Sequence, residues 1–413
     1  MNLYQVFRDS GSNFVQTVLN MKKIFLFPKL QTLILVVALL LSGVNYGFSQ
    51  SAKISGKKTI NVVMEPRAWD TTGLKTEFGQ FDGYQSMKLL AGRKQAILKD
   101  VQFTDGTIEF DVQPLDVAHN PFISFYFRWQ SNMETECFYM RLGSPHPEKR
   151  NDAVQYSPFV KNAELWNLLD QYQGPANINY AGWNHVKFIV SGKQFRAYIN
   201  DMQHPCMQVP YLEGETKQGL FAFDGRAAYA NMVIKPGITE DLPAVAGVDL
   251  TDHDPYYIRH WQLGKPVMMP AGHEISAADL PKDTATWTPI TAERRGLINV
   301  SRVYGLLPNR ANRYVWLKTN IHSDKDQVVS MQLGFLDDVS MFINGKLLYQ
   351  DKNTYFLPIH KEPAGRLDLI NSTVRIPLKA GDNTVTVAIS NYFYGWGIVS
   401  RLENLDGIDL PSN

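Results

Sequence analysis

Short runs of alternating apolar and polar residues fill most of the chain after residue 57, and Gly, Asp and Asn turns separate them. A period of two is typical of half-buried β-strands. It predicts strands in the first half at 96–103, 106–112, 122–130, 136–142, 185–190, 194–199 and 219–222. In the second half it predicts strands at 257–269, 313–321, 327–333, 339–343, 373–376, 383–389 and 397–402. No β-α-β alternation is visible, which argues against nucleotide-binding α/β folds.

Two strand runs end at an asparagine, in Asn200-Asp201 and in Asn344-Gly345. Both dipeptides suit the positive φ angles of tight turns, so they predict two hairpins about one domain length apart. Residues 236–254 are rich in Pro, Gly and acids and break the strand pattern, as a linker does. We therefore expect an all-β protein of two antiparallel β-sandwiches, or jelly rolls, at 57–235 and 255–410, joined by this short linker.

The N-terminal region has the zones of a secretory signal: a basic start at 21–23, an apolar run at 33–41 and small residues before Gln50. It predicts a signal over 21–49, preceded by an over-called extension at 1–20. Because no cysteine lies near the cleavage point, no lipid anchor is expected. The mature protein is predicted to be periplasmic or extracellular, without a membrane anchor.

The composition restricts the possible binding partners more than it restricts the possible folds. A formal net charge of +1 gives no general attraction to nucleic acid, and the 12% aromatic content suits both strands and sugar-stacking faces. Whether the two cysteines, Cys137 and Cys206, form a bridge stays open. No cofactor is predicted; acids at 337–338 and at 324–326 suit either a structural calcium ion or solvated turns.

The strongest candidate for a binding surface comes from two neighbouring strands. Tyr126 and Arg128 lie two residues apart on the first strand, so they point to the same face, and the same holds for Tyr139 and Arg141 on the second strand. If these strands pair in register, the four side chains share one sheet face, over which the following loop-rich stretch could fold. Arginine forks, tyrosine hydroxyls and an indole suit a saccharide, although a solvated antiparallel face fits the same pattern. The predicted ligand-binding residues are Tyr126, Arg128, Tyr139, Arg141, Gln155 and Trp166.

The run 106–112 brings in a family resemblance, because Glu109 and Asp111 lie two apart on one strand face. This resembles the concanavalin A-like lectin and glucanase superfamily, whose glucanases carry a further Glu on the same strand. Here Gln113 and Pro114 occupy the place of that Glu, so a retaining mechanism lacks one of its two carboxylates. The resemblance therefore implies a lectin-like fold without this catalytic strand, and no catalytic residue is predicted.

Further resemblances support the same architecture. The run 182–192 leading into Tyr198-Ile199-Asn200 resembles laminin-G-like domains and the domain named for 3-keto-disaccharide hydrolases. Residues 313–402, with Met341-Phe342-Ile343-Asn344-Gly345 and Gly381-Asp382-Asn383, resemble the galactose-binding-like module of exported carbohydrate-active proteins. The aromatic run 391–397 could form a stacking platform or plug the end of the sandwich.

Three functions follow as hypotheses. The first is an exported carbohydrate-associated binding protein without catalysis. The second is a glycoside hydrolase or lyase that acts on glycans or modified disaccharides through the first domain. The third is a structural or adhesion module that binds another protein.

Overall fold

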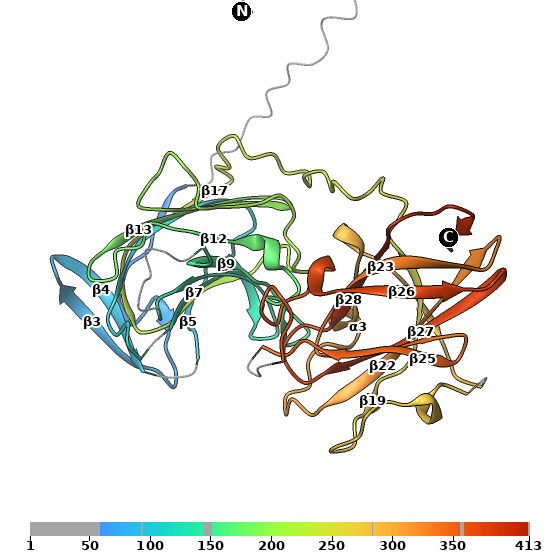
Figure 1. Ribbon diagram of the computed structural model, residues 1–413. Coiled ribbons are helices and arrows are strands. Elements are labelled where there is room, and N and C mark those ends of the chain that lie inside the picture. Colours follow the sequence, from blue (N-terminus) through green and yellow to red (C-terminus); the bar gives the residue numbers. More distant parts are fainter. Residues whose placement is uncertain are drawn as a thin grey trace, which may run out of the picture. The chain divides into compact units, whose positions relative to one another are not determined.

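The computed structural model describes residues 58–91, 94–119, 121–143, 151–282, 284–355 and 359–411, and Figure 1 shows it as a ribbon. The predicted signal therefore lies outside the described residues. By their contacts, the described residues belong to one compact unit. The boundary predicted at 236–254 thus stays a prediction.

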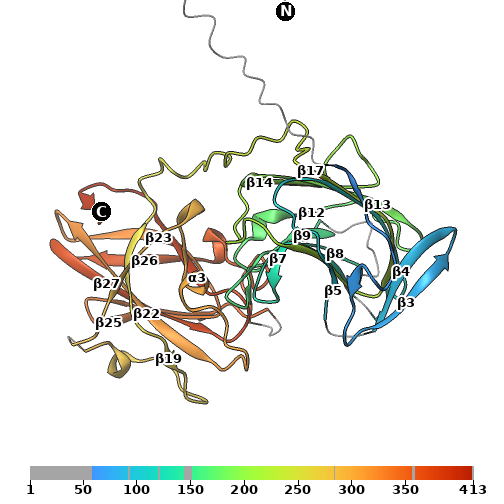
Figure 2. The same cartoon turned by 180° about the vertical axis from the view of Figure 1, so that it is seen from behind.

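Two antiparallel sheets are built from the first half of the described chain, and Figure 2 shows β13, β14 and β17 in one layer with β7, β8 and β9 in the other. Sheet 1 has the order β15-β14-β13-β6-β17-β4-β3, with β1 beside β17. Its strands are β1 (Ile60–Asn61), β3 (Lys75–Phe81), β4 (Tyr84–Ala91), β6 (Gly106–Pro114), β13 (Asn184–Ser191), β14 (Gln194–Ile199), β15 (Met207–Val209) and β17 (Ala227–Pro236).

Sheet 2 has the order β11-β10-β8-β7-β16-β5-β2, with β9 beside β8 and β12 beside β9. Its strands are β2 (Trp69–Asp70), β5 (Ala96–Leu98), β7 (Phe122–Ser131), β8 (Glu134–Arg141), β9 (Val154–Tyr156), β10 (Phe159–Val160), β11 (Ala163–Glu164), β12 (Gln173–Gly174) and β16 (Leu220–Asp224). The core between sheets 1 and 2 is aromatic: Phe110 of β6 lies 4.9 Å from Phe125 of β7, and Phe188 of β13 lies 5.3 Å from Phe138 of β8. Burial of these rings against one another holds the two sheets together.

Two further antiparallel sheets come from the second half. Sheet 3 has the order β20-β18-β22-β27-β24-β25, with β19 and β29 beside β22, and sheet 4 has the order β21-β28-β23-β26. Sheet 3 comprises β18 (His260–Leu263), β19 (Val267–Met268), β20 (Thr288–Thr291), β22 (Arg313–Ser323), β24 (Asp338–Ile343), β25 (Lys346–Lys352), β27 (Gly381–Asn391) and β29 (Ile408–Asp409). Sheet 4 comprises β21 (Leu297–Asn299), β23 (Gln327–Phe335), β26 (Ser372–Leu378) and β28 (Gly397–Leu402). Aliphatic side chains of both sheets, with Trp261 and Trp396, form the second core.

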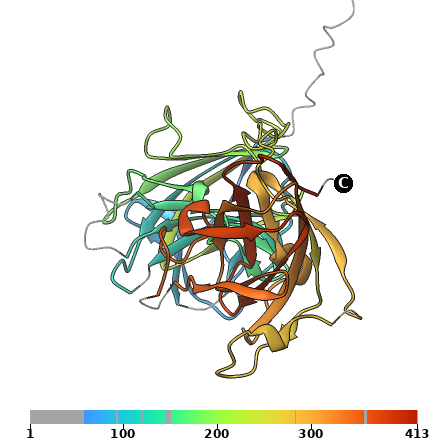
Figure 3. The same ribbon diagram turned by 45° about the vertical axis from the view of Figure 1, so that its right-hand side comes forward.

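Helical structure in the described residues is short: α3 (Val300–Tyr304) and the 3-10 turns η2 (Asp170–Tyr172), η3 (Ala277–Asp279), η4 (Arg294–Gly296) and η5 (Leu369–Asn371). The gold segment that carries η3 lies outside the strands in Figure 3. Just before η3, Ile275 belongs to one hydrophobic cluster with Tyr314 and Trp316 of β22. None of the described helices is long and apolar enough to cross a membrane. The prediction of an all-β protein built from antiparallel sandwiches is confirmed.

The two asparagine turns share one hydrogen-bond arrangement, in which each turn residue locks onto a second asparagine. Nδ2 of Asn200 donates to Oδ1 of Asn184 over 2.9 Å, and Nδ2 of Asn344 donates to Oδ1 of Asn383 over 2.9 Å. The Oδ1 of each turn residue accepts the backbone N–H of the residue that follows the second asparagine: His185 donates to Asn200, and Thr384 donates to Asn344. The φ angles of 63° and 50° are the left-handed values that asparagine tolerates.

Only one of these turns makes a tight hairpin. Ile343 pairs with Lys346 across Asn344-Gly345, as the sequence predicts. After Asn200 the next strand, β15, begins at Met207, so the prediction of a tight hairpin there is wrong. The carboxylate of Asp201 accepts the N–H groups of Gln203 and His204, which makes a local turn that lengthens the loop.

Candidate functional site

The outer face of sheet 2, which points away from the core, carries a row of polar groups across four strands. Asp224 of β16 pairs with Ser124 of β7, Ser124 pairs with Tyr139 of β8, and Tyr139 pairs with Gln155 of β9. Directly paired residues point to the same side of a sheet, so the four side chains lie in one line. The next pair along β7 and β8, Tyr126 with Cys137, extends this face.

Arg141 organises one end of the row. Its guanidinium donates to the Tyr139 hydroxyl over 2.9 Å and to Oε1 of Gln155, and it forms a 3.3 Å ion pair with Asp152. Gln155 is fully buried beneath this network, where its Nε2 donates to the carbonyl of Trp166 over 2.7 Å. Because these groups are saturated by each other, they fix the positions of the Tyr139 and Trp166 rings.

Aromatic rings cover this polar face from the side opposite the core. Trp166 follows β11, Tyr355 follows β25, and Phe393 and Tyr394 lie between β27 and β28. The Trp166 ring lies edge-to-face with Tyr355 at 5.0 Å and with Tyr394 at 5.8 Å. Tyr355 stacks on Phe393 at 6.2 Å. Segments far apart in the sequence thus form one aromatic wall.

The loop that carries Phe393 and Tyr394 is held from two sides. Asn167 accepts the N–H of Gly395 over 2.9 Å and donates to the carbonyl of Phe393 over 3.4 Å. The buried carboxyl of Asp337 accepts the N–H groups of Tyr392 and Phe393 over 2.9 and 3.2 Å. These bonds satisfy backbone groups that would otherwise leave the loop free to move.

Between the polar row and the aromatic wall lies a cavity of about 300 Å³, a size at the lower end of ligand-binding pockets. Its lining combines aromatic, carboxyl, hydroxyl, thiol and guanidinium groups, from Phe122, Ser124, Tyr126, Cys137, Tyr139, Arg141, Phe159, Glu164, Trp166, Asp224, Tyr355, Phe393 and Tyr394. We call it the sheet 2 cavity.

The carboxyl groups of this cavity have altered proton affinities. Burial raises the pKa of Glu164 to about 7, although the charge of Arg141 partly opposes this. Burial also raises the pKa of Asp224, against a hydrogen bond from the N–H of Gly225. The thiol of Cys137 has a pKa well above its usual value because it is buried and because both carboxylates lie near it. Near neutral pH, Glu164 is therefore divided between its two protonation states.

The structure brings together five of the six residues that the sequence singled out, and it separates the sixth. Tyr126, Tyr139, Arg141 and Trp166 line the sheet 2 cavity, and Gln155 supports it from below. Whether they bind a ligand stays a prediction.

The predicted shared face does not extend to Arg128. The register of β7 and β8 shifts between Phe127 and Ser131, and Arg128 itself has a φ of 50°. This bulge redirects the side chain, because an extra residue changes which face it occupies. The buried guanidinium instead binds Asp105 at 2.8 Å and the carbonyl of Gly192 at 2.9 Å. We therefore remove Arg128 from the candidate site.

Sequence reasoning missed the two carboxyl residues of the cavity. Glu164 and Asp224 are single acids near strand ends, and no local pattern marks them. Phe122 and Ser124 could have been found from the sequence, because they lie four and two residues before Tyr126 on the same strand and so point to the same face. In the aromatic run 391–397, Trp396 is buried in the second core, while Phe393 and Tyr394 line the cavity; that they form a stacking platform for a ligand stays a prediction.

The strand acids behind the glucanase resemblance lie on sheet 1, outside this cavity. Glu109 forms a 2.6 Å ion pair with Lys235, and Asp111 binds Nδ1 of His185 at 2.7 Å. The hydrogen bond that the His185 ring donates to Asp111, and then the charges of both acids, raise the pKa of His185. Glu109 and Asp111 are therefore paired with neighbouring side chains of sheet 1.

The described parts of the chain do not place three or more His, Cys, Asp or Glu side chains together as a metal site would require. Asp337 holds backbone N–H groups, and Asp326 pairs with Lys379 at 2.7 Å. Both cysteines are free thiols, with Cys137 on β8 and Cys206 just before β15.

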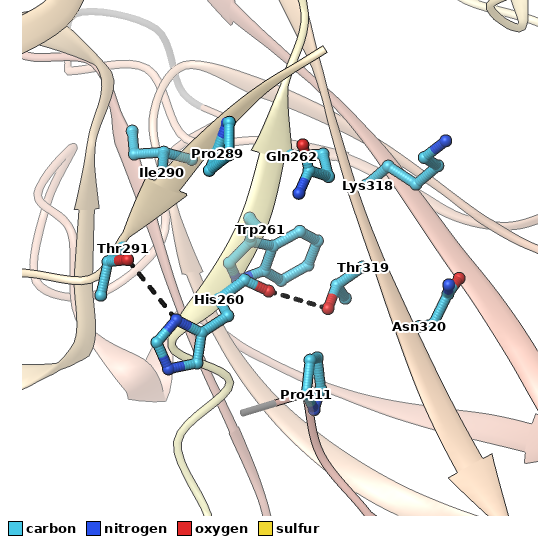
Figure 4. A pocket seen from close by; sticks show the side chains of 10 residues that line it. All are labelled: His260, Trp261, Gln262, Pro289, Ile290, Thr291, Lys318, Thr319, Asn320 and Pro411. Atoms are coloured by element: carbon cyan, nitrogen blue, oxygen red, sulfur yellow. Dashed lines mark hydrogen bonds between the residues drawn. The ribbon is translucent and has the colours of Figure 1, made fainter. Parts of the chain in front are cut away.

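A second hollow, of about 400 Å³, lies on sheet 3 (Figure 4). Gln262, Lys318 and Asn320 surround it with amide and amine groups, and Thr291 is hydrogen-bonded to His260. Trp261 is 2% exposed, and none of the ten lining residues carries a carboxyl group. The sheet 2 cavity is smaller than this hollow, but it contains carboxyl groups as well as a guanidinium group.

No protein-family model matches the sequence, and no curated protein matches it. Solved structures similar to part of the chain include a family 66 carbohydrate-binding module from Bacillus subtilis, at 18% identity, covering 44% of this chain and 97% of that one, with a TM-score of 0.25. A Bacillus subtilis protein of unknown function with a galectin-like fold is 11% identical and covers 44% of this chain and 97% of that one, with a TM-score of 0.30. Chicken galectin 2 is 12% identical and covers 32% of this chain and 94% of that one, with a TM-score of 0.26. TM-scores this low do not support any inference about the ligand of this chain.

Proposed function

We propose that this protein is an exported carbohydrate-binding protein whose ligand occupies the sheet 2 cavity. The observation that carries the proposal is the pairing of a polar row, from Asp224 to Gln155, with an aromatic wall around Trp166. Sugars present hydroxyl groups at their edges and apolar C–H faces, so a site with both kinds of wall matches them. Assignment of 57–235 as concanavalin A-like and of 255–410 as galactose-binding-like is part of this proposal.

The test is a glycan array with the mature chain, followed by calorimetric titration of each glycan that binds. Trp166→Phe and Tyr394→Ala should each weaken binding at least tenfold, about 1.4 kcal/mol, because they remove ring surface from the cavity wall. Trp183→Ala is the matched control, since Trp183 packs on Tyr84 and Phe81 and does not line the cavity. Binding that survives both cavity variants would place the site elsewhere. A blank array, with a cell-envelope protein recovered by pull-down, would favour the adhesion hypothesis.

One observation favours glycoside hydrolysis as a second candidate. Glycosidases use two carboxyl groups, one of which keeps its proton near neutral pH, and the cavity contains Glu164 and Asp224. If this candidate is correct, any glycan that binds is slowly cleaved, and Glu164→Gln abolishes cleavage while binding persists. Release of reducing ends, measured over a day, separates turnover from binding alone.

A further inference from the structure

The sheet 2 cavity has different chemistry at its two ends. At one end, the guanidinium of Arg141 is occupied by Asp152, Tyr139 and Gln155. At the other end, Tyr126 and Cys137 form a floor on β7 and β8, and these strands lie between β16 and β11 in sheet 2. Asp224 ends β16 and Glu164 ends β11, so the floor is flanked by two carboxyl groups.

The floor lies in a negative electrostatic field. After burial, the charges of Glu164 and Asp224 are causes of the raised pKa of the Cys137 thiol, and both also raise that of the Tyr126 hydroxyl. Arg141 is the one cation among the described residues that line the cavity, and its donors face the other end. The charges of Arg141 and Arg310 lower the pKa of Glu164, but burial outweighs them, and no cation is among the causes that act on the pKa of Asp224.

Aromatic rings border the same space. Phe159 lies 6.2 Å from the Tyr126 ring, and Trp166 and Tyr394 complete the cavity wall. Ring faces attract cations, and this attraction grows when water is excluded. Arg366 lies over the Trp166 ring at 5.4 Å and Arg310 over the Tyr394 ring at 4.7 Å. A bound cation would therefore face the Tyr126 and Phe159 rings together with the two acid groups.

We propose that this end of the cavity binds the protonated amino group of an amino sugar, with the ammonium held between Glu164 and Asp224 over Tyr126 and Cys137. The inference rests on the proposed function and adds a ligand class to it. An ammonium places a positive charge beside two carboxyl groups whose pKa values burial raises, whereas a hydroxyl supplies only a neutral hydrogen bond and a sugar carboxylate is repelled.

The test uses two matched series, glucosamine, N-acetylglucosamine and glucose, and the corresponding three galactose derivatives. Within each series only the group at one ring carbon changes. With the full mature chain at pH 7, the amino sugar should bind about tenfold more tightly than its neutral partners. The preference should grow between pH 5.5 and 7 as Glu164 ionises while the amine stays protonated.

Glu164→Gln and Asp224→Asn keep the side-chain shape and remove one charge each. Each should reduce the preference, taken as the ratio of the two affinities of the same variant, to about threefold or less. Glu77→Gln is the matched control, because Glu77 pairs with Lys88 on the exposed part of sheet 1. If one cavity variant does not fold, as judged by circular dichroism, the other still decides the outcome.

The outcomes are distinguishable. Neutral sugars that bind as tightly as amino sugars overturn this inference and leave the proposed function intact. Free lysine that binds as tightly as glucosamine overturns the saccharide part. If none of the six sugars binds and the glycan array is blank, both proposals fall.

Discussion

At the residue scale, the sheet 2 cavity depends on polar groups that are buried in different ways. Arg141, Tyr139 and Gln155 are satisfied by one another, so burial costs them little. Glu164 faces the cavity with a pKa of about 7, which means that folding favours its neutral form. Such a group makes the stability of the fold depend on pH.

Ionisation of Glu164 should lower the free energy of unfolding as pH rises, and Glu164→Gln should remove this part of the pH dependence. The folded-state pKa is above the ordinary value of 4.5, so the stabilisation is fully present below about pH 4.5 and is lost as pH rises through about 7. After allowance for solvent screening, we expect the wild type to lose about 1–3 kcal/mol relative to Glu164→Gln between pH 4.5 and 7.5. Urea unfolding across this range measures the difference; parallel stability curves for the two proteins would contradict it. Glu213, whose pKa is also about 7, contributes equally to both proteins.

At the element scale, the loop between β27 and β28 connects the aromatic wall to the rest of the site. Its Gly395 sits where a side chain would collide with its neighbours, since an added Cβ would lie 2.5 Å from Oδ1 of Asn167 and 2.6 Å from Cγ of Leu168. Asn167 and Leu168 are buried and cannot easily move away. The absence of a side chain at residue 395 thus lets the loop approach the segment that carries Trp166.

Gly395→Ala should push this loop away and open the cavity. We expect a loss of about 1–3 kcal/mol in stability from overpacking and a loss of at least tenfold in saccharide affinity, because Phe393 and Tyr394 move with the loop. Thermal unfolding and calorimetric titration measure the two effects. Unchanged affinity in a destabilised variant would show that the loop is structural only.

At the scale of the whole molecule, the sheet 2 cavity takes residues from both halves of the chain. Hydrogen bonds also join the halves, from the N–H of Leu367 to the carbonyl of Asn167 over 2.8 Å and from the N–H of Leu306 to the carbonyl of Lys161 over 3.1 Å. Leu297, Leu306, Leu336, Leu367 and Val399 pack in the same hydrophobic cluster as the first core. The second half therefore helps to build the proposed site as well as its own core.

Because of these shared contacts, the two halves should unfold together. We expect one calorimetric transition for the mature chain, with equal calorimetric and van't Hoff enthalpies. A saccharide that binds in the sheet 2 cavity should shift the whole transition upward. Two separate transitions, only one of which moves with ligand, would show that the halves are independent domains.

The all-β class follows from the sequence alone, because strand periodicity is a local property and is repeated in almost every element. The sequence also placed Tyr126, Tyr139 and Arg141 on one face, since side-chain parity follows from the strand pattern as long as the strand is regular. It could not foresee the bulge that removes Arg128, nor that the loop after Asn200 is long, because register and loop closure depend on partners elsewhere in the chain.

Tertiary packing alone brings Glu164, Asp224 and the rings of Phe393 and Tyr394 together over that face. These residues are distant in sequence and carry no shared pattern, so their proximity arises from how the sheets and loops pack. The altered proton affinity of Glu164 has the same origin, because desolvation is a property of the folded surroundings and not of the residue.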